Sequence, residues 1–172
     1  MYDAIEINGI EYNRTNLDRL VDDCPKPAPD WLRDLYLFLQ DWFSGKESFW
    51  VKTSGSTGDP KKYEVSRQAM IASAQRTLAF FNLRPGQKAL LCLPVSFIAG
   101  KMMVVRALVG QLSLVVVEPS GLPLQHIDSP IDFAAFTPMQ MMGECSRQPN
   151  PHLNLLRKVI IGGGAVHSSL QD

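Results

Sequence analysis

From residue 48 onward, apolar residues occur in two patterns that alternate along the chain. Short, largely apolar runs at 48–51, 89–93, 112–117, 131–136 and 156–161 have the length of buried strands. Between several of them, apolar residues recur at helical spacing, over 66–81, 98–109 and 138–146. Strand and helix in alternation are typical of βαβ units, so we expect an α/β fold with a mostly parallel sheet and right-handed crossovers.

End signals support these helices. Ser66 is a candidate N-cap, and Gly110 is expected to stop the helix that starts near residue 98. Thr137 and Gln140 have the spacing of a capping box, with a proline at the first helical position.

The first 47 residues follow a different pattern. Asn8-Gly9 between alternating runs predicts a hairpin over 5–12 with a type I′ turn. Thr15 is expected to cap a short helix at 17–21. Three prolines predict a rigid connector at 24–29. Asp30 is expected to cap the next helix, which ends at Gly45. In this last helix, an apolar stripe predicts core: Trp31, Leu35, Phe38 and Trp42. We therefore expect residues 1–47 to pack on an α/β unit of residues 48–172.

Four unusual segments follow the predicted strands. They are the loop from Thr53, residues 94–101, Thr137, and the glycines Gly162, Gly163 and Gly164. In a parallel sheet, ligands bind outside the carboxyl ends of the strands. The sequence therefore predicts one binding cleft at that edge.

Composition narrows the class of partner. The 17 Lys and Arg balance the 17 Asp and Glu, so neither nucleic acid nor an anionic membrane surface is an expected partner. The apolar stretch 102–117 is interrupted and too short to span a bilayer. Three separated cysteines without a C-x-x-C motif, and an N-terminus without a basic secretory pattern, favour the cytoplasm. We expect small-molecule partners; the oligomeric state is open, with a homodimer as one option.

The loop after residue 52 carries the clearest chemistry. Its small and hydroxylated residues offer backbone N–H and O–H donors to a polyphosphate: Thr53, Ser54, Gly55, Ser56, Thr57 and Gly58, followed by Lys61. It is not a Walker loop, because Pro60 rather than glycine precedes Lys61. The alternative is a flexible Gly/Ser linker, which Pro60 and the helix that follows argue against.

The order Thr-Ser-Gly-Ser-Thr-Gly-Asp-Pro-Lys resembles the signature loop of the adenylate-forming superfamily, which includes acyl-CoA synthetases and adenylation domains. The resemblance implies that residues 53–58 hold the β- and γ-phosphates of ATP. It also implies that Thr57 binds Mg²⁺ and that Lys61 is catalytic, through its positively charged ammonium group. It also implies the substrates ATP, a carboxylic acid and coenzyme A.

Three further segments extend the resemblance: 93–108 is similar to the family's acyl-pocket helix, 133–141 to its Pro-Thr segment and 156–166 to its Gly-rich strand end. The residues in these segments are most similar to those of o-succinylbenzoate:CoA ligases of menaquinone biosynthesis. There are departures. Lys62 and Tyr63 stand where the family usually has glycine and an aliphatic residue, Ser66-Arg67 replaces Ser-His, and Phe97 replaces a histidine common in those ligases.

Several residues have two interpretations. Phe97 is either an acyl-pocket wall or core. Lys101, one turn beyond Phe97, could receive a carboxylate or snorkel from a packed helix, whereas Arg106 is expected to point elsewhere. Gly162, Gly163 and Gly164 allow a planar group to approach the backbone, or simply make a tight turn. No histidine has the spacing of a metal ligand.

The resemblance implies a two-step reaction, acyl-adenylate formation followed by transfer to coenzyme A. The family's later motifs and its C-terminal catalytic lysine would lie beyond Asp172, so we expect a fragment that is inactive alone. Rival interpretations are another aryl or acyl acid:CoA ligase, an adenylation domain, or a non-catalytic nucleotide-binding or interaction module.

Overall fold

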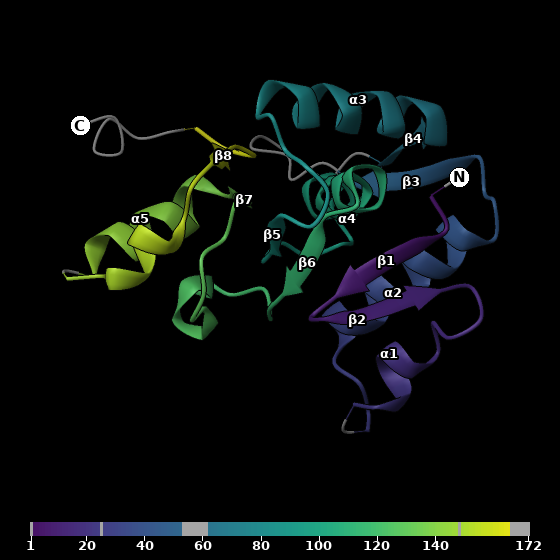
Figure 1. The fold of residues 1–172 in the computed structure, drawn as a ribbon, viewed down its shortest axis with the longest axis horizontal. Coiled ribbons are helices and arrows are strands. Elements are labelled where there is room, and N and C mark those ends of the chain that lie inside the picture. Colours follow the sequence, from purple (N-terminus) through teal and green to yellow (C-terminus); the bar gives the residue numbers. More distant parts are fainter. Residues whose placement is uncertain (1, 25, 53–61, 148, 166–172) are drawn as a thin grey trace.

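The computed structural model describes residues 2–24, 26–52, 62–147 and 149–165 of the 172-residue chain (Figure 1). Its strands are β1 (Ala4–Ile7), β2 (Ile10–Asn13), β3 (Ser48–Lys52), β4 (Lys62–Ser66), β5 (Lys88–Leu91), β6 (Ser113–Val116), β7 (Phe133–Phe136) and β8 (Val159–Ile161). Its α-helices are α1 (Arg19–Asp22), α2 (Asp30–Phe43), α3 (Arg67–Phe80), α4 (Ile98–Gly110) and α5 (Pro138–Ser146). Two 3-10 helices, η1 (Pro123–His126) and η2 (Pro151–Leu155), lie in connections.

Six strands form one sheet in the order β2-β1-β6-β5-β7-β8. Every neighbouring pair is parallel except β1 and β2. At its centre, Leu90 of β5 is paired with Val115 of β6 on one side and with Ala134 of β7 on the other. The predicted α/β fold with a mostly parallel sheet is confirmed, and the N-terminal hairpin joins that sheet through β1 (Figure 1).

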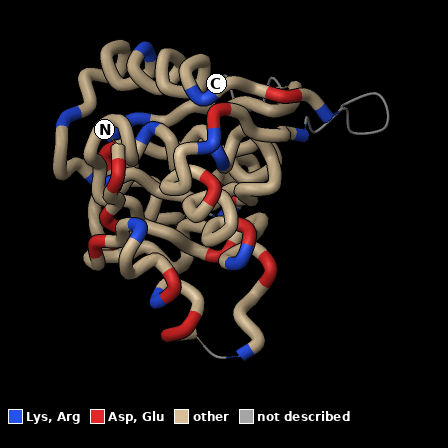
Figure 2. Tube along the Cα trace, turned by 90° about the vertical axis from the view of Figure 1, so that its right-hand side faces the viewer, with Lys and Arg blue, Asp and Glu red and all other residues tan. Residues whose placement is uncertain are grey.

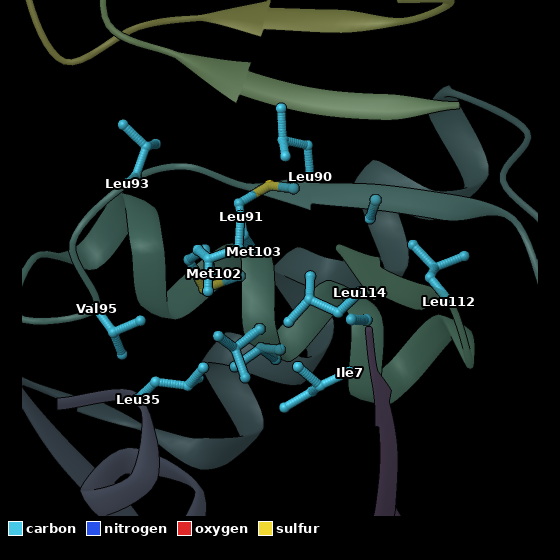
Figure 3. Close-up of a cluster of buried hydrophobic side chains, with 14 of the residues drawn as sticks. Ile7, Leu35, Leu90, Leu91, Leu93, Val95, Met102, Met103, Leu112 and Leu114 are labelled. Carbon is cyan, nitrogen blue, oxygen red and sulfur yellow. The ribbon is translucent and has the colours of Figure 1, made fainter. Parts of the chain in front are cut away.

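Helix α4 lies in the middle of the hydrophobic core. It packs against β5, β6 and β1 and also against α3, so residues around its circumference are buried. Figure 3 shows Met102 and Met103 of α4 near Leu91 and Leu114 of the sheet, with Leu35 of α2 close by. The core therefore fixes the start of α4 relative to the strand ends.

The prediction of parallel βαβ units is wrong for residues 48–66. Strands β3 and β4 form a separate antiparallel two-stranded sheet, and β4 was not predicted. Burial alternates along β3: Phe49 and Val51 are buried, whereas the side chain of Trp50 is 62% exposed. One face of this hairpin is therefore open to solvent, as antiparallel pairing allows.

The N-terminal turn was predicted correctly, but two caps were not. Asn8 and Gly9 have φ angles of 49° and 81°, as a type I′ turn requires. The Thr15 hydroxyl donates to Asn13 Oδ1 (2.7 Å), and α1 begins only at Arg19. Asp30 is the first residue inside α2, with a proline at the N-cap position.

Helix α4 ends at Gly110, as predicted. Gln111 takes the left-handed conformation that caps the helix, with φ 51°. A Cβ on Gly110 would lie 2.6 Å from Cδ2 of Leu78 in α3. This glycine therefore allows α3 to pack closely on α4.

The capping box at the start of α5 is present as predicted. Thr137 Oγ1 accepts a hydrogen bond from the Gln140 N–H (3.2 Å), and Gln140 Oε1 accepts one from the Thr137 N–H (3.0 Å). The Gln140 amide also donates to the carbonyls of Cys92 (3.1 Å) and Ser120 (2.9 Å). One buried side chain thus ties α5 to the end of β5 and to the loop after β6.

Charged residues of both signs are distributed along the chain (Figure 2). Within the described ranges, every helix is too short or too polar to cross a membrane.

Candidate functional site

A cavity of about 420 Å³, called here the strand-end cavity, opens where the parallel strands end. Pro94 follows β5, Thr137 follows β7, and Gly162 and Gly163 follow β8; Phe97 and other residues of the α4 start close the side. The sequence predicted that these segments would meet, and three of the four unusual segments do line one cavity.

The turn into α4 is held by close backbone packing. The Phe97 N–H donates to the Pro94 carbonyl (3.2 Å). A Cβ on Gly100 would lie only 2.3 Å from that same carbonyl oxygen. Because only glycine leaves this space, Gly100 allows the close turn that brings Phe97 to the cavity.

The glycines after β8 differ in what surrounds them. A Cβ at Gly162 would meet no atom of the described residues within 4 Å, and Gly162 lines the cavity. Gly163 has a φ of 81°, which favours glycine. Gly164 lies outside the lining, and a Cβ there would be 3.7 Å from Cδ of Pro138.

Arg106 lies in the wall of this cavity, although the sequence interpretation directed it elsewhere. Its Nη1 donates to Met103 Sδ (3.5 Å), and its guanidinium carbon lies 5.9 Å from the ring centroid of Phe133. Its Nε is buried with no hydrogen-bond partner among the described residues. Burial lowers the pKa of Arg106 to about 10. Burying a cation whose N–H donor has no acceptor costs free energy, unless an acceptor forms a hydrogen bond with that donor.

A signal for Arg106 was present in the sequence. Ile98, Met102 and Arg106 are spaced i, i+4 and i+8, which places them on one helical face, and all three line the cavity. A helical face counted from Phe97 misses Arg106, because Phe97 precedes the helix and has extended backbone angles.

Lys101 does not line the strand-end cavity. It lines a second cavity of about 580 Å³, the lysine cavity, with Trp50, Lys52, Lys62 and Ser96. Its ammonium donates to the Val95 carbonyl (2.6 Å) and lies 5.6 Å from the ring centroid of Phe38. Burial lowers the pKa of Lys101, and Asp34 opposes this shift. The predicted partners Phe97 and Lys101 therefore face different cavities.

The predicted phosphate loop lies outside the described residues: Thr53, Ser54, Gly55, Ser56, Thr57, Gly58 and Lys61. Its two flanks are described. Lys52 and Lys62 are paired across the β3–β4 hairpin, and Lys52 also forms a parallel bridge with Phe97. The strand that leads to the loop therefore ends beside the strand-end cavity.

Metal binding was predicted only at Thr57, which is not described. Within the described ranges, no group of three or more His, Cys, Asp or Glu side chains could hold a metal ion.

Comparisons with known proteins identify the family and the fold of this chain. A family model described as "AMP-binding enzyme" matches residues 48–172. An acyl-CoA synthetase (AMP-forming)/AMP-acid ligase II-like protein from Dyadobacter fermentans is 35% identical, with a TM-score of 0.77 over 92% of this chain and 45% of that chain. No curated protein matches.

Two more distant structures share the fold. MenE from E. coli, with a bound analogue of OSB-AMS, is 25% identical over 71% of this chain and 26% of that chain, with a TM-score of 0.54. O-succinylbenzoate coenzyme A synthetase (MenE) from Bacillus subtilis, in complex with AMP, is 17% identical over 70% of this chain and 26% of that chain, with a TM-score of 0.56. The present chain spans less than half the length of each of these three proteins.

Proposed function

This chain belongs to the AMP-binding enzyme family, and from that premise we propose that it provides the phosphate loop and acid pocket of an ATP-dependent acid:CoA ligase. In the first step of the proposed reaction, a carboxylate oxygen attacks the α-phosphorus of ATP, giving an acyl-adenylate and releasing pyrophosphate. In the second, the thiol sulfur of coenzyme A attacks the acyl carbon, and AMP leaves. Turnover requires a longer polypeptide in this proposal, because the chain spans only 45% of the Dyadobacter protein.

In this proposal, the predicted phosphate loop binds the phosphates of ATP, because its residues offer suitable donors. Backbone N–H and hydroxyl donors of residues 53–58 hold the β- and γ-phosphates, and Thr57 binds Mg²⁺. Lys61 neutralises the charge that develops on the departing pyrophosphate. The bridge between Lys52 and Phe97 supports this assignment, since it brings the start of the loop to the edge where the acid would bind.

The acid we propose is an aromatic dicarboxylate, and o-succinylbenzoate is the specific candidate. The observation that carries this choice is Arg106, a buried guanidinium with an unused Nε donor in an otherwise largely apolar cavity. A second carboxylate on the acid would accept a hydrogen bond from Arg106 Nε, while the carboxylate to be activated points toward the phosphates. A monocarboxylic acid would leave Arg106 unpaired.

The cavity also suits an aromatic ring. Phe97 and Met102 offer apolar contact, and Gly162 presents bare backbone over which a planar group can lie. Two MenE proteins share this fold, and the ligands in their descriptions are consistent with the proposal. We also propose a cytoplasmic location, where ATP and coenzyme A are supplied.

An acid panel in ATP–pyrophosphate exchange, run with a ligase that carries this chain, tests the proposal. We expect exchange with o-succinylbenzoate that exceeds exchange with its monocarboxylic analogue by about tenfold or more, and Arg106→Gln should remove most of that difference. Equal rates for both acids would favour another aryl or acyl acid:CoA ligase or an adenylation domain. Absence of exchange with every acid, despite nucleotide binding, would favour a non-catalytic module.

A further inference from the structure

One face of α2 is open to solvent and has an apolar residue at its middle. Arg33, Leu37 and Asp41 follow one another at intervals of four residues, so they lie on one helical face. Leu37 is 52% exposed, and it lines a cavity together with Trp50, which is 62% exposed. Because large apolar side chains that are exposed together mark interaction sites, this face is a candidate contact surface.

Two cavities share Leu37 and none of their other lining residues. The first, of about 200 Å³, includes Trp50 and Asp41. The second, called here the α1–α2 cavity, has about 690 Å³ and lies between α1, the connector that follows it and α2. Its lining offers apolar contact and two cations, from Val21, Pro27, Ala28, Lys26 and Arg33. An exposed ring thus lies on one side of Leu37 and a hollow on the other.

The charges of this face are placed symmetrically about Leu37. Arg33 comes four residues before it and Asp41 four residues after it. If two copies of α2 pack antiparallel across a twofold axis at Leu37, Arg33 of each copy faces Asp41 of the other. The same axis brings Trp50 of each copy to the α1–α2 cavity of the other. The face is therefore complementary to itself in both charge and shape.

Both charged residues can form this contact. Arg33 Nη1 lies 3.7 Å from Asp30 Oδ1, and both side chains are exposed, so this ion pair contributes little. Asp41 Oδ2 pairs with Lys46 Nζ (2.6 Å), and the second oxygen of a carboxylate can accept from a guanidinium. Contact between two copies removes water from the charges and strengthens their attraction. Arg33 thus exchanges a weak contact within the chain for a stronger one between copies.

We propose that this face of α2 joins two copies of the chain in a homodimer. Leu37 of one copy packs on Leu37 of the other at the axis, and the ring of Trp50 enters the α1–α2 cavity, where Lys26 can lie over it. Tryptophan and arginine are enriched among the residues that dominate the binding energy of protein interfaces. The inference goes beyond the proposed function and does not depend on it, because neither ATP nor an acid takes part.

Sedimentation equilibrium of the chain at concentrations up to about 1 mM tests the proposal. We expect a monomer–dimer equilibrium that Leu37→Glu weakens by about tenfold or more, because two like charges then meet at the axis. Met139→Glu is the matched control, at an apolar residue of α5 that is 80% exposed, and should leave the dissociation constant within about twofold. A chain that stays monomeric at every concentration, or equal effects of the two substitutions, overturns the proposal.

A charge exchange tests the pairing itself, with circular dichroism to confirm that each variant is folded. Arg33→Glu and Asp41→Lys should each weaken self-association by about tenfold, because each places like charges opposite each other at both ends of the interface. An equimolar mixture of the two variants should dimerise about as well as the unchanged chain, since opposite charges then face each other at both ends. A mixture that dimerises no better than either variant alone overturns the proposed interface.

Discussion

Lys52 and Phe97 are joined by a parallel β-bridge, although 45 positions separate them in the sequence. The bridge connects the β3–β4 hairpin, which is outside the main sheet, to the turn that starts α4. The flank of the predicted phosphate loop and the wall of the strand-end cavity are therefore held together by backbone contact. A nucleotide at the loop and an acid in the cavity would meet at this junction.

Gly100→Ala should disrupt the junction. An added Cβ would lie 2.3 Å from the Pro94 carbonyl oxygen, and backbone cannot yield as a side-chain end can. We expect a loss of about 1–3 kcal/mol in the free energy of unfolding, measured by urea denaturation. Gly121→Ala is the matched control, since a Cβ there meets no atom of the described residues within 4 Å and should cost less than about 0.5 kcal/mol. Equal losses would contradict the role of Gly100.

Arg106→Met should affect stability and acid binding in opposite directions. The substitution removes a buried charge whose Nε has no partner among the described residues, so we expect a gain of about 1 kcal/mol in the free energy of unfolding. The dicarboxylate should lose about tenfold or more in affinity. Thermal unfolding and calorimetry check the two effects. Arg76→Met, on the exposed side of α3, should change neither. A destabilised variant with unchanged acid affinity would show that Arg106 is structural.

Gln140→Ala should cost more stability than Thr137→Ala. Loss of the Thr137 cap is expected to cost about 1 kcal/mol. Loss of Gln140 removes the other half of the box and also leaves the carbonyls of Cys92 and Ser120 without this donor, so we expect about 2 kcal/mol or more. Denaturant titration of both variants gives the order. The reverse order would mean that solvent satisfies those carbonyls.

Local signals account for the parts of the fold that were predicted. The Asn8-Gly9 turn and the capping box of Thr137 and Gln140 depend on neighbours within a few residues, and both formed as expected. The parallel strands were visible because burial on both faces leaves apolar runs.

Features that depend on tertiary packing were not predicted. Strand β4 carries charged and polar residues on its open face and shows no apolar run, so only its pairing with β3 reveals it. The steric role of Gly110 was not predicted, because it involves Leu78, 32 positions earlier in the sequence. Arg106 was missed because the helical face was counted from Phe97, whose extended backbone lies outside the helical repeat.

The central claim is that residues 53–61 bind nucleotide phosphates beside the strand-end cavity. Titration of Mg²⁺-ATP into the chain and into Lys61→Ala and Gly58→Val tests it most directly, with circular dichroism to confirm folding. We expect each substitution to weaken binding by about tenfold or more, because one removes a charged donor and the other obstructs the approach of phosphate to the backbone. Unchanged ATP affinity in both folded variants would contradict the claim.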